Sequence, residues 1–600
     1  MRDDAKVTTG LRLLCTSDLH MAIDGSRLLA DGNAQLGLAA LARPILQARA
    51  EVGASLLFDL GDAFQGSPLT DDLDVESIGA GHPMQQAIDA LGFDGQTLGN
   101  HDLDFGLSYL RAIRKTARTP MVCANLHWID GGPVLPTRAM QRVQTDGGQS
   151  LLVGFTGALP PRVMRWNRHH LCGRVTVEEI APAIRREAVA LREEGAHIVV
   201  ILAHTGIVPH GHPDEDEHTV LAISAIDEVD AILCGHQHRL FPGADFRAIE
   251  GIDPIRGVVN GKPCIMPGWQ GDRIGVLDLL LERVDDGAWR VGSHDASFRR
   301  AAVEADPCIE AIAAPHVART RTRLSTVISR TEKPLDTTFA SVADVAAVRA
   351  VQAAMWWKAR PEVEADLPLV AVTAAVRNGG RGGPQHFTRI PAGELTERAV
   401  ADLCPFANHN MVVAATGGDL RRWLEMGSTH IAQLHSTRPA QSFVNPDMPG
   451  YSFDGALGVT YAIDPTRPHR FDASGRLANP EAHRIVDLRL GGEALADDRP
   501  VAIVASTYRL AGGGNFPGLD VLPPLTGDLG LTHELVADWM AAHPRGLPLP
   551  GPSWTFRPSH PVSAILRTGA GEPPPETGAE LQHLGSTSDG WHDWRVVLTP

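Results

Sequence analysis

Positive charge is in short supply in this 600-residue chain. Its 54 lysines and arginines face 71 acidic residues, which gives a formal net charge of -17. Proteins that bind the backbone of a nucleic-acid polymer usually carry a basic face, so this balance argues against such a partner. The charge balance does not exclude a small phosphate-bearing substrate, because bound metal ions could supply positive charge locally.

Cysteines and long apolar runs are also scarce. The seven cysteines are dispersed and none stands in a CxxC pair, so we expect reduced thiols rather than a disulfide framework. The first 20 residues lack an apolar segment followed by a small-residue cleavage site, which predicts a protein that stays in the cytoplasm. No run of roughly 18 apolar residues occurs, so we expect no membrane span and no membrane partner.

Short apolar runs alternate with helical patterns over the first 300 residues or so. Runs such as SLLFDLG and AHIVVILAH are separated by amphipathic stretches at 106–118 and 177–194, an alternation typical of α/β folds. Within the stretch 35–52, Pro44 predicts a helix that is kinked or split.

The chain divides into four predicted segments. Residues 1–305 form an α/β domain, 306–335 a helical linker, and 336–560 a second domain of the α+β class. The second domain opens with a helical pattern and later carries the strand-like runs LGVTYAID and VAIVAST. Residues 561–600 are rich in Gly, Pro, Ser and His, and we predict that they form a loosely ordered tail.

Five polar motifs stand out in the first half: SDLH, LGDAFQG, LGNHDLD, LAHTG and CGHQH. All but one plainly follow an apolar strand-like run. Side chains just beyond the carboxyl ends of strands converge on one crevice of an open α/β sheet, so we expect these motifs to meet. Their oxygen and imidazole donors, without thiolate, suit Mn, Zn or Fe. A carboxylate can bridge two ions about 3.5–4 Å apart for displacement at phosphorus, so the motifs predict a two-metal phosphoesterase site.

Chance is the alternative explanation, because the chain has 26 histidines and a single such motif means little. Five motifs in one order are better explained by a metal centre. The histidines outside them are expected to be ordinary surface groups, namely His169, His170, His210, His212, His218 and those of the tail.

The ordered pattern DxH, GDxxQG, GNHxxD, H and GHxH resembles that of the calcineurin-like metallophosphoesterases. Over about residues 11–525 the chain is similar to the two-domain 5′-nucleotidase family. The stretches GHQHRLFPGADF and GVVNGKPCIMPGWQGDRIGVLDL look like its 2′,3′-cyclic-nucleotide 2′-phosphodiesterase/3′-nucleotidase subgroup. The resemblance implies a four-layer α/β sandwich, a nucleotide-binding second domain and rotation about the linker. Because relatives are commonly exported, it also makes the periplasm the alternative location.

Carried over by position, the resemblance implies a complete set of site residues. One metal ion would be held by Asp18, His20, Asp62 and His238, and the other by Asp62, Asn100, His204 and His236. His101 and Asp104 match the catalytic pair of the family. Asp102 stands where the family usually has Glu, outside the metal ligands.

The second domain contains glycine-rich loops with isolated aromatics, which could be ordinary turns or a clamp for a nucleobase. Stacking a base on aromatic rings gains about 1–3 kcal/mol, whichever base it is. The resemblance implies that Tyr508 covers one face of the base and that Tyr451 or Phe453 covers the other. Arg377 and Arg381 flank the NGG turn, and Arg381 looks like the substrate-binding arginine of the family, with a solvated surface charge as its alternative.

One departure from the family bears on the substrate. Typical 5′-nucleotidases carry an Asp that grips the ribose hydroxyls, and Gly514 replaces it in the run GGGNF. This favours a dimetal hydrolase that converts 2′,3′-cyclic nucleotides to 3′-nucleotides and then to nucleoside and phosphate. The alternatives are a 5′-nucleotidase or UDP-sugar hydrolase, a dimanganese thiosulfohydrolase, and a nucleotide-binding protein with a degenerate site. The paired aromatics and NGGR loop argue against the thiosulfohydrolase, and the complete ligand set argues against the degenerate site.

Overall fold

A computed structural model describes residues 7–25, 28, 37–212, 214–284, 287–438, 440–574 and 577–600, without the side chain of Arg381. The contacts between residues divide the chain into two compact units, with the boundary between Thr320 and Arg321. Among the helices of the described residues, none combines the length and the hydropathy that crossing a membrane requires.

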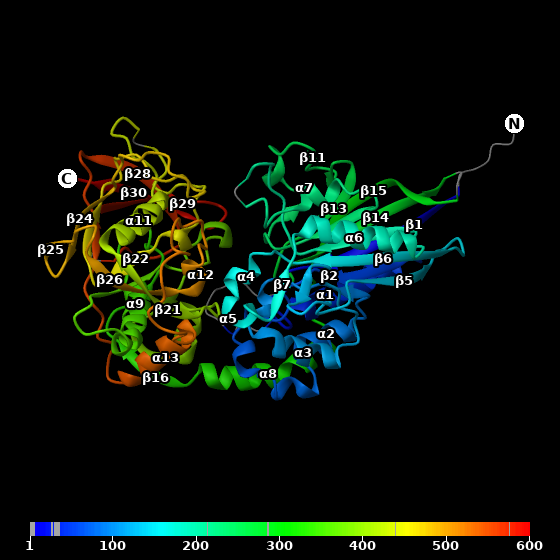
Figure 1. The fold of residues 1–600 in the computed structure, drawn as a ribbon, viewed down its shortest axis with the longest axis horizontal. Helices are drawn as coiled ribbons and strands as arrows, with labels where there is room; N and C mark the ends of the chain where they lie inside the picture. The colour runs from blue at the N-terminus through cyan, green and yellow to red at the C-terminus, as the bar shows by residue number, and fades with distance from the viewer. Residues whose placement is uncertain are drawn as a thin grey trace. The chain divides into compact units, whose positions relative to one another are not determined.

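Two sheets build the first unit, as the ribbon in Figure 1 shows. One has the strand order β15-β14-β1-β2-β3, and the other has the order β11-β12-β13-β9-β8-β6-β5 with β10 beside β13. The strands are β1 (Thr8–Thr16), β2 (Ser55–Asp59), β3 (Gly95–Gln96), β5 (Arg138–Gln144), β6 (Ser150–Ala158), β8 (Ile198–Ala203), β9 (Ala231–Cys234), β10 (Leu240–Phe241), β11 (Ile252–Asp253), β12 (Val258–Val259), β13 (Lys262–Pro267), β14 (Arg273–Arg283) and β15 (Trp289–Arg300). A small separate sheet pairs β4 (Leu126–Trp128) with β7 (Val175–Val177).

Helices cover the outer faces of both sheets. Helix α6 packs on β6 and β8, and α1 packs on β14 and β15. The helices are α1 (Gly37–Ala50), α2 (Pro83–Ala90), α3 (Gly106–Thr116), α4 (Val163–Trp166), α5 (Arg168–Leu171), α6 (Ile180–Glu193) and α7 (Val220–Ser224). Helix α1 runs through Pro44 as one helix, so the prediction of a split there is wrong.

Strand β8 shows why this unit has four layers. Every residue from Ile198 to Ala203 is buried, because alternate side chains enter two different cores. Ile198, Val200 and Leu202 lie in the core between the two sheets. Val199, Ile201 and Ala203 lie in the core under α6 and α7. A strand buried on both faces reads as a continuous apolar run, and the predicted four-layer α/β sandwich is confirmed.

The predicted linker contains helix α8 (Pro307–Leu324) and, after it, strand β16 (Val327–Thr331). The second unit has two four-stranded sheets, β21-β26-β18-β22 and β25-β24-β23-β27, and the small pairs β16-β20 and β17-β19. The strands are β17 (Leu335–Asp336), β18 (Leu369–Thr373), β19 (Arg389–Ile390), β20 (Gly393–Thr396), β21 (Asn410–Thr416), β22 (Gly455–Leu457), β23 (Thr460–Ile463), β24 (Ile485–Leu490), β25 (Glu493–Ala494), β26 (Pro500–Ser506) and β27 (Trp554–Phe556). The helices are α9 (Ala346–Ala359), α10 (Glu397–Leu403), α11 (Gly417–Gly427), α12 (Thr507–Leu510) and α13 (Thr532–Ala542).

The prediction of a loosely ordered tail is wrong. Residues after 560 form a three-stranded sheet in the order β28-β30-β29, with β28 (Val562–Thr568), β29 (Glu580–Ser586) and β30 (His592–Leu598). One face of β28 and β30 packs into the core of the second unit through Ala564, Leu566 and Val596, each at most 2% exposed. The tail is therefore a structural part of that unit.

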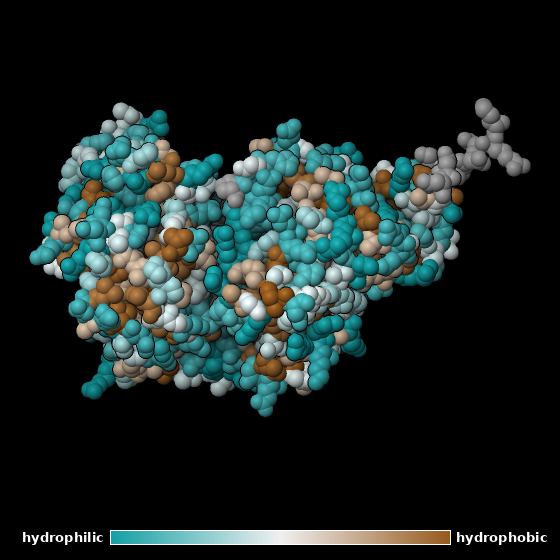
Figure 2. All heavy atoms as spheres, viewed as in Figure 1, coloured by the Kyte–Doolittle hydropathy of each residue, from teal (hydrophilic) through white to brown (hydrophobic). Residues whose placement is uncertain are grey.

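On the face drawn in Figure 2, apolar residues are scattered over a mainly hydrophilic surface. Large exposed hydrophobic side chains such as Ile255 and Val521 occur along the chain. Singly scattered apolar residues are normal for a protein surface and do not by themselves indicate a partner.

Candidate metal centre

The predicted ligands lie on loops that leave the carboxyl ends of four strands. Asp18 and His20 follow β1, Asp62 follows β2, His204 comes directly after β8, and His236 and His238 follow β9. Strands β1 and β2 are parallel, and so are β8 and β9, so their carboxyl ends lie at the same edge of each sheet. The expected convergence of the motifs is confirmed, because ligand atoms of Asp18, His20 and His238, and of Asp62, His204 and His236, lie within 4.8 Å of one another in each group.

These loops hold an unusual backbone conformation. Positive φ angles occur at Asp18 (51°), His20 (47°), Asp62 (56°), His236 (72°) and His238 (55°). Such angles are uncommon outside glycine, although Asp and His tolerate them better than most residues. Residues held in sparsely populated conformations cluster at functional sites, where the surroundings must fix them.

The first group of donors brings one carboxylate and two imidazoles together. His20 donates from Nδ1 to the carbonyl of Gln65 at 2.9 Å, so the neutral ring presents an unprotonated Nε2. That Nε2 lies 3.1 Å from Nε2 of His238, which in turn lies 3.2 Å from Oδ1 of Asp18. Burial, together with the nearby His238, lowers the pKa of His20 to about 4. Apart from this contact with His238, Oδ1 of the fully buried Asp18 has no hydrogen-bond partner among the described residues, and a cation shared by the three groups would satisfy it.

The atoms of the second group are also arranged around a place for a positive charge. His204 donates from Nδ1 to the carbonyl of Leu60 at 2.8 Å. Its Nε2 lies 3.2 Å from Oδ2 of Asp62 and 3.3 Å from Oδ1 of Asn100. Burial lowers the pKa of His204, but the charge of Asp62 outweighs it and raises the pKa to about 10. A positive charge belongs between these atoms, as a proton or as a metal ion, so the residues present fit a metal.

Asp102 fixes the loop that presents Asp62. Its carboxylate accepts the backbone N–H groups of Gly99 (2.8 Å), Asp62 (2.9 Å), Ala63 (3.0 Å) and Phe64 (3.0 Å). The approach is tight, since a Cβ added at Gly99 would lie 2.1 Å from Oδ1 of Asp62. The family pattern gave Asp102 no role, and the structure gives it the task of joining two motifs.

The predicted catalytic pair is in contact. Nδ1 of His101 donates to Oδ2 of Asp104 at 2.8 Å, and Asn167 donates to the other oxygen of that carboxylate at 3.0 Å. Burial lowers the pKa of His101, but the charges of Asp104 and Asp62 outweigh it and raise the pKa to about 9. The ring of His101 lies 5.4 Å from that of His20, so the pair borders the first donor group.

Two functional candidates were missed at the sequence level. Oε1 of Glu217 accepts a hydrogen bond from Nε2 of His236 at 2.7 Å. The prediction that His218 is an ordinary surface group is wrong, because its ring lies 5.4 Å from that of His236 and burial lowers its pKa to about 3. Both residues belong to the acidic run DEDEH, in which no spacing singles them out.

Of the two arginines predicted to bind substrate, the structure describes the side chain of Arg377 only. Arg377 is buried, with Nη1 3.4 Å from Oδ1 of the equally buried Asp402. This ion pair favours a structural role for Arg377, and substrate binding stays a prediction for it. The side chain of Arg381 lies outside the described part of the structure.

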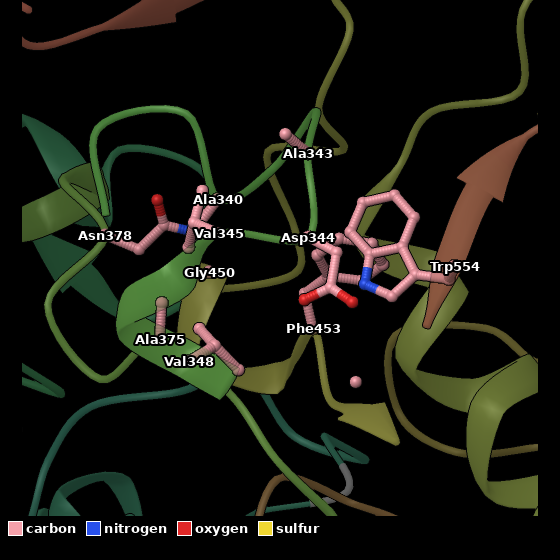
Figure 3. A pocket seen from close by; sticks show the side chains of 11 residues that line it. Ala340, Ala343, Asp344, Val345, Val348, Ala375, Asn378, Gly450, Phe453 and Trp554 are labelled. Atoms are coloured by element: carbon pink, nitrogen blue, oxygen red, sulfur yellow. The ribbon is translucent and has the colours of Figure 1, made fainter. Parts of the chain in front are cut away.

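Exposure separates the two candidates for the second stacking ring. Phe453 is 9% exposed and its ring lies 5.2 Å from that of Trp554 and 5.5 Å from that of His430. Phe453, Trp554 and Asp344 line a cavity whose volume is about 10 Å³, which is room for about one water and not for a base. Figure 3 shows these three side chains together. Tyr451, in a single 3-10 turn at Gly450–Ser452, is 45% exposed. Tyr508, in α12, is partly exposed, so exposure favours Tyr451 and Tyr508.

Comparison with known proteins agrees with this geometry. Residues 11–240 match the model of the calcineurin-like phosphoesterases, whose members use divalent metal ions, and residues 320–520 match the 5′-nucleotidase C-terminal domain. A structure from Staphylococcus aureus, provisionally described as a 5′-nucleotidase, shares the fold with a TM-score of 0.74 at 20% identity, over 91% of this chain and 100% of that one.

Two curated relatives are more similar in sequence. The trifunctional nucleotide phosphoesterase protein YfkN of Bacillus subtilis is 30% identical over 91% of this chain, but the chain spans only 39% of its length. The 2′,3′-cyclic-nucleotide 2′-phosphodiesterase/3′-nucleotidase of Salmonella typhimurium is 33% identical over 93% of this chain and 90% of its own length. The chain therefore belongs to the family of 2′,3′-cyclic-nucleotide 2′-phosphodiesterase/3′-nucleotidases, hydrolases built from a calcineurin-like phosphoesterase domain and a 5′-nucleotidase C-terminal domain.

Proposed function

We propose that this chain hydrolyses 2′,3′-cyclic nucleotides to 3′-nucleotides, and then 3′-nucleotides to nucleoside and phosphate. The observation that carries the choice of substrate is the run GGGNF beside Tyr508, where Gly514 offers no carboxylate to ribose hydroxyls. A cyclic phosphate ties up both of those hydroxyls, so such a carboxylate would have no partner there. The name of the Salmonella relative supports the same choice.

Two divalent ions complete the proposed site. Asp18, His20, Asp62 and His238 would hold one, and Asp62, Asn100, His204 and His236 the other, with Asp62 shared. When bound, the ions supply positive charge that offsets the charge of the phosphoryl oxygens and lowers the pKa of water. The oxygen and imidazole donors suit Mn, Zn or Fe.

His101 is the proposed proton donor. Because Asp104 engages its Nδ1, the proton transfer would use Nε2. In the first step the oxygen of water bonds to phosphorus, the bond from phosphorus to O2′ breaks, and O2′ takes the proton of His101. The proton that water loses passes to the solvent, from which His101 regains one before the second step. In the second step the same donor protonates O3′. Asn167, which donates to Asp104, would keep the carboxylate turned toward the imidazole.

The second unit would bind the nucleoside part. Tyr451 and Tyr508 would stack on the two faces of the base, which gains about 1–3 kcal/mol and tolerates any base. Affinity would then depend little on whether the base is adenine or uracil.

The test is a panel of four substrates, 2′,3′-cyclic AMP, 3′-AMP, 5′-AMP and UDP-glucose, after elemental analysis of the purified protein. We expect two metal ions per chain and kcat/KM values for the first two substrates at least tenfold above those for the last two. The variant His210→Ala, at an exposed histidine of the same unit, is the matched control and should keep the wild-type order. A preference for 5′-AMP or UDP-glucose would contradict the proposed substrate, and a metal-free active protein would contradict the mechanism.

The cytoplasm is the proposed compartment. All seven cysteines are free thiols in the structure, which supports a reducing environment. Recovery of the protein in the periplasmic fraction of its source cells would contradict this proposal.

A further inference from the structure

A buried arginine joins the two loops that carry the proposed base-stacking rings. Arg509, next to Tyr508, is 6% exposed. Its Nη2 donates to the carbonyl of Tyr451 at 2.8 Å, and its Nη1 donates to the carbonyl of Gly513. One side chain therefore contacts the backbone of the loop at 449–454 and closes the loop at 508–516.

The guanidinium of Arg509 also forms an ion pair with Asp454 and packs on the ring of Phe516. Nε of Arg509 lies 2.8 Å from Oδ2 of Asp454, and Nη2 donates to Oδ1 of the same carboxylate at 3.2 Å. The indole of Trp423 donates to Asp454 at 2.7 Å, and the ring of Phe516 lies 4.1 Å from the guanidinium carbon. A paired, planar and stacked arginine is a rigid spacer, which a lysine cannot reproduce.

This arginine occupies the space in which a side chain at position 514 would lie. A Cβ added at Gly514 would stand 2.4 Å from Nη1 of Arg509 and 3.1 Å from Oγ of Ser452. Gly514 also has a φ of 74°, a left-handed conformation that penalises most side chains. The resemblance to the 5′-nucleotidases implies that position 514 is where they carry a ribose-binding Asp. The clash at the added Cβ means that a side chain at this position and the guanidinium of Arg509 cannot both keep the places described.

We infer that Arg509 and Gly514 form one coupled specificity determinant, in which Arg509 is a positioning residue for Tyr451 and Tyr508 and its guanidinium excludes a ribose-binding carboxylate at position 514. The part of the inference that concerns substrate preference rests on the proposed function. The steric coupling between Arg509 and position 514 does not. The coupling makes a single substitution toward the 5′-nucleotidase pattern unfavourable, because both positions must change together.

The coupling is tested by a double-mutant cycle that needs no substrate. Gly514→Asp, Arg509→Ser and the double variant are compared with the wild type by thermal unfolding. We expect Gly514→Asp to lower Tm clearly in the presence of Arg509, and to lower it by less than half as much in the Arg509→Ser background. Equal shifts in both backgrounds would overturn the coupling, whatever the substrate proves to be.

The positioning role is tested by kinetics. For Arg509→Met we expect KM for 2′,3′-cyclic AMP to rise at least tenfold more than KM for bis-p-nitrophenyl phosphate, a diester without a base, and Arg509→Lys to recover only part of the loss. Arg557→Met removes an exposed arginine paired with Asp487 in the same unit and is the matched control. Equal changes on both substrates would overturn the positioning role, since a merely structural defect affects both alike. A wild-type protein that prefers 5′-AMP would contradict the proposed function. The double-mutant cycle would still decide whether Arg509 and position 514 are coupled.

Discussion

Replacing Glu217 tests whether the carboxylate behind His236 contributes to metal binding. Glu217 accepts a hydrogen bond from Nε2 of His236 at 2.7 Å, which fixes the ring and leaves Nδ1 for the proposed ion. Removing such a partner typically weakens metal affinity or activity 10–100-fold, or about 1.4–2.8 kcal/mol. We therefore expect Glu217→Ala to raise the metal concentration needed for half-maximal activity by about 10–100-fold. Glu217→Gln should lie at the low end, because its amide oxygen can still accept the bond.

The structure also supplies the control. Arg162 contacts Glu217 at 2.8 Å, but it keeps Asp214 at 2.8 Å and Asp216 at 2.6 Å when Glu217 is removed, so the loop stays tied. Asp216→Asn disturbs the same arginine from an exposed position, and no contact joins Asp216 to His236 among the described interactions. The measurement is activity against free Mn²⁺ or Zn²⁺, with metal content by elemental analysis after dialysis. If Glu217→Ala retained metal like the wild type, or Asp216→Asn lost as much, the reasoning would be refuted.

Three further outcomes are expected. Chelation should abolish hydrolysis of p-nitrophenyl phosphate and added Mn²⁺ should restore it, whereas activity in protein shown to be metal-free would contradict the proposed centre. His101→Ala should retain both metal ions and lose turnover about 10²–10⁴-fold, and a near-normal rate would remove its role as proton donor. Leu566→Ala, at a side chain 2% exposed, should lower the free energy of unfolding by about 2–5 kcal/mol in urea denaturation, whereas Leu584→Ala, 43% exposed, should change it little; equal effects would mean that the β28-β30 sheet does not pack as described.

The convergence of the candidate ligands could be predicted because each of them is close in sequence to a strand end. A strand such as β8 is buried on both faces, so it reads as an unbroken apolar run, and the polar residue that follows it is conspicuous. Residues that act from loops without such a strand left no signal. Glu217 is one acid in a run of acids, and only the fold brings it to His236.

The wrong prediction for residues 561–600 has a different cause. It rested on their amino-acid composition and overlooked the hydrophobic periodicity of the strand at 562–568. Glycines and prolines at 569–574 belong to the connection between β28 and β29, while the strand VSAILRT alternates between buried and half-buried or exposed positions. That period of two is the signal of a half-buried strand, and it was present in the sequence. In the same way Pro44 suggested a kinked or split helix, but α1 runs through it as one helix with buried residues on both sides of the proline.

What no local pattern could reveal is how the ligand loops hold their backbone. Five of the predicted ligands have positive φ angles, and each such residue costs of order 1 kcal/mol even for the tolerant Asp and His types. The sum, about 5 kcal/mol, is comparable with the whole stability of a small domain, so the loops cannot adopt this form by themselves. They are fixed by contacts between loops, in which N–H of Asp18 donates to Gly61 at 3.0 Å and N–H of His20 donates to Asp62 at 2.8 Å. The ligand set is therefore one cooperative unit, because a change in any of these loops alters the conformation of its neighbours and with it the position of every donor.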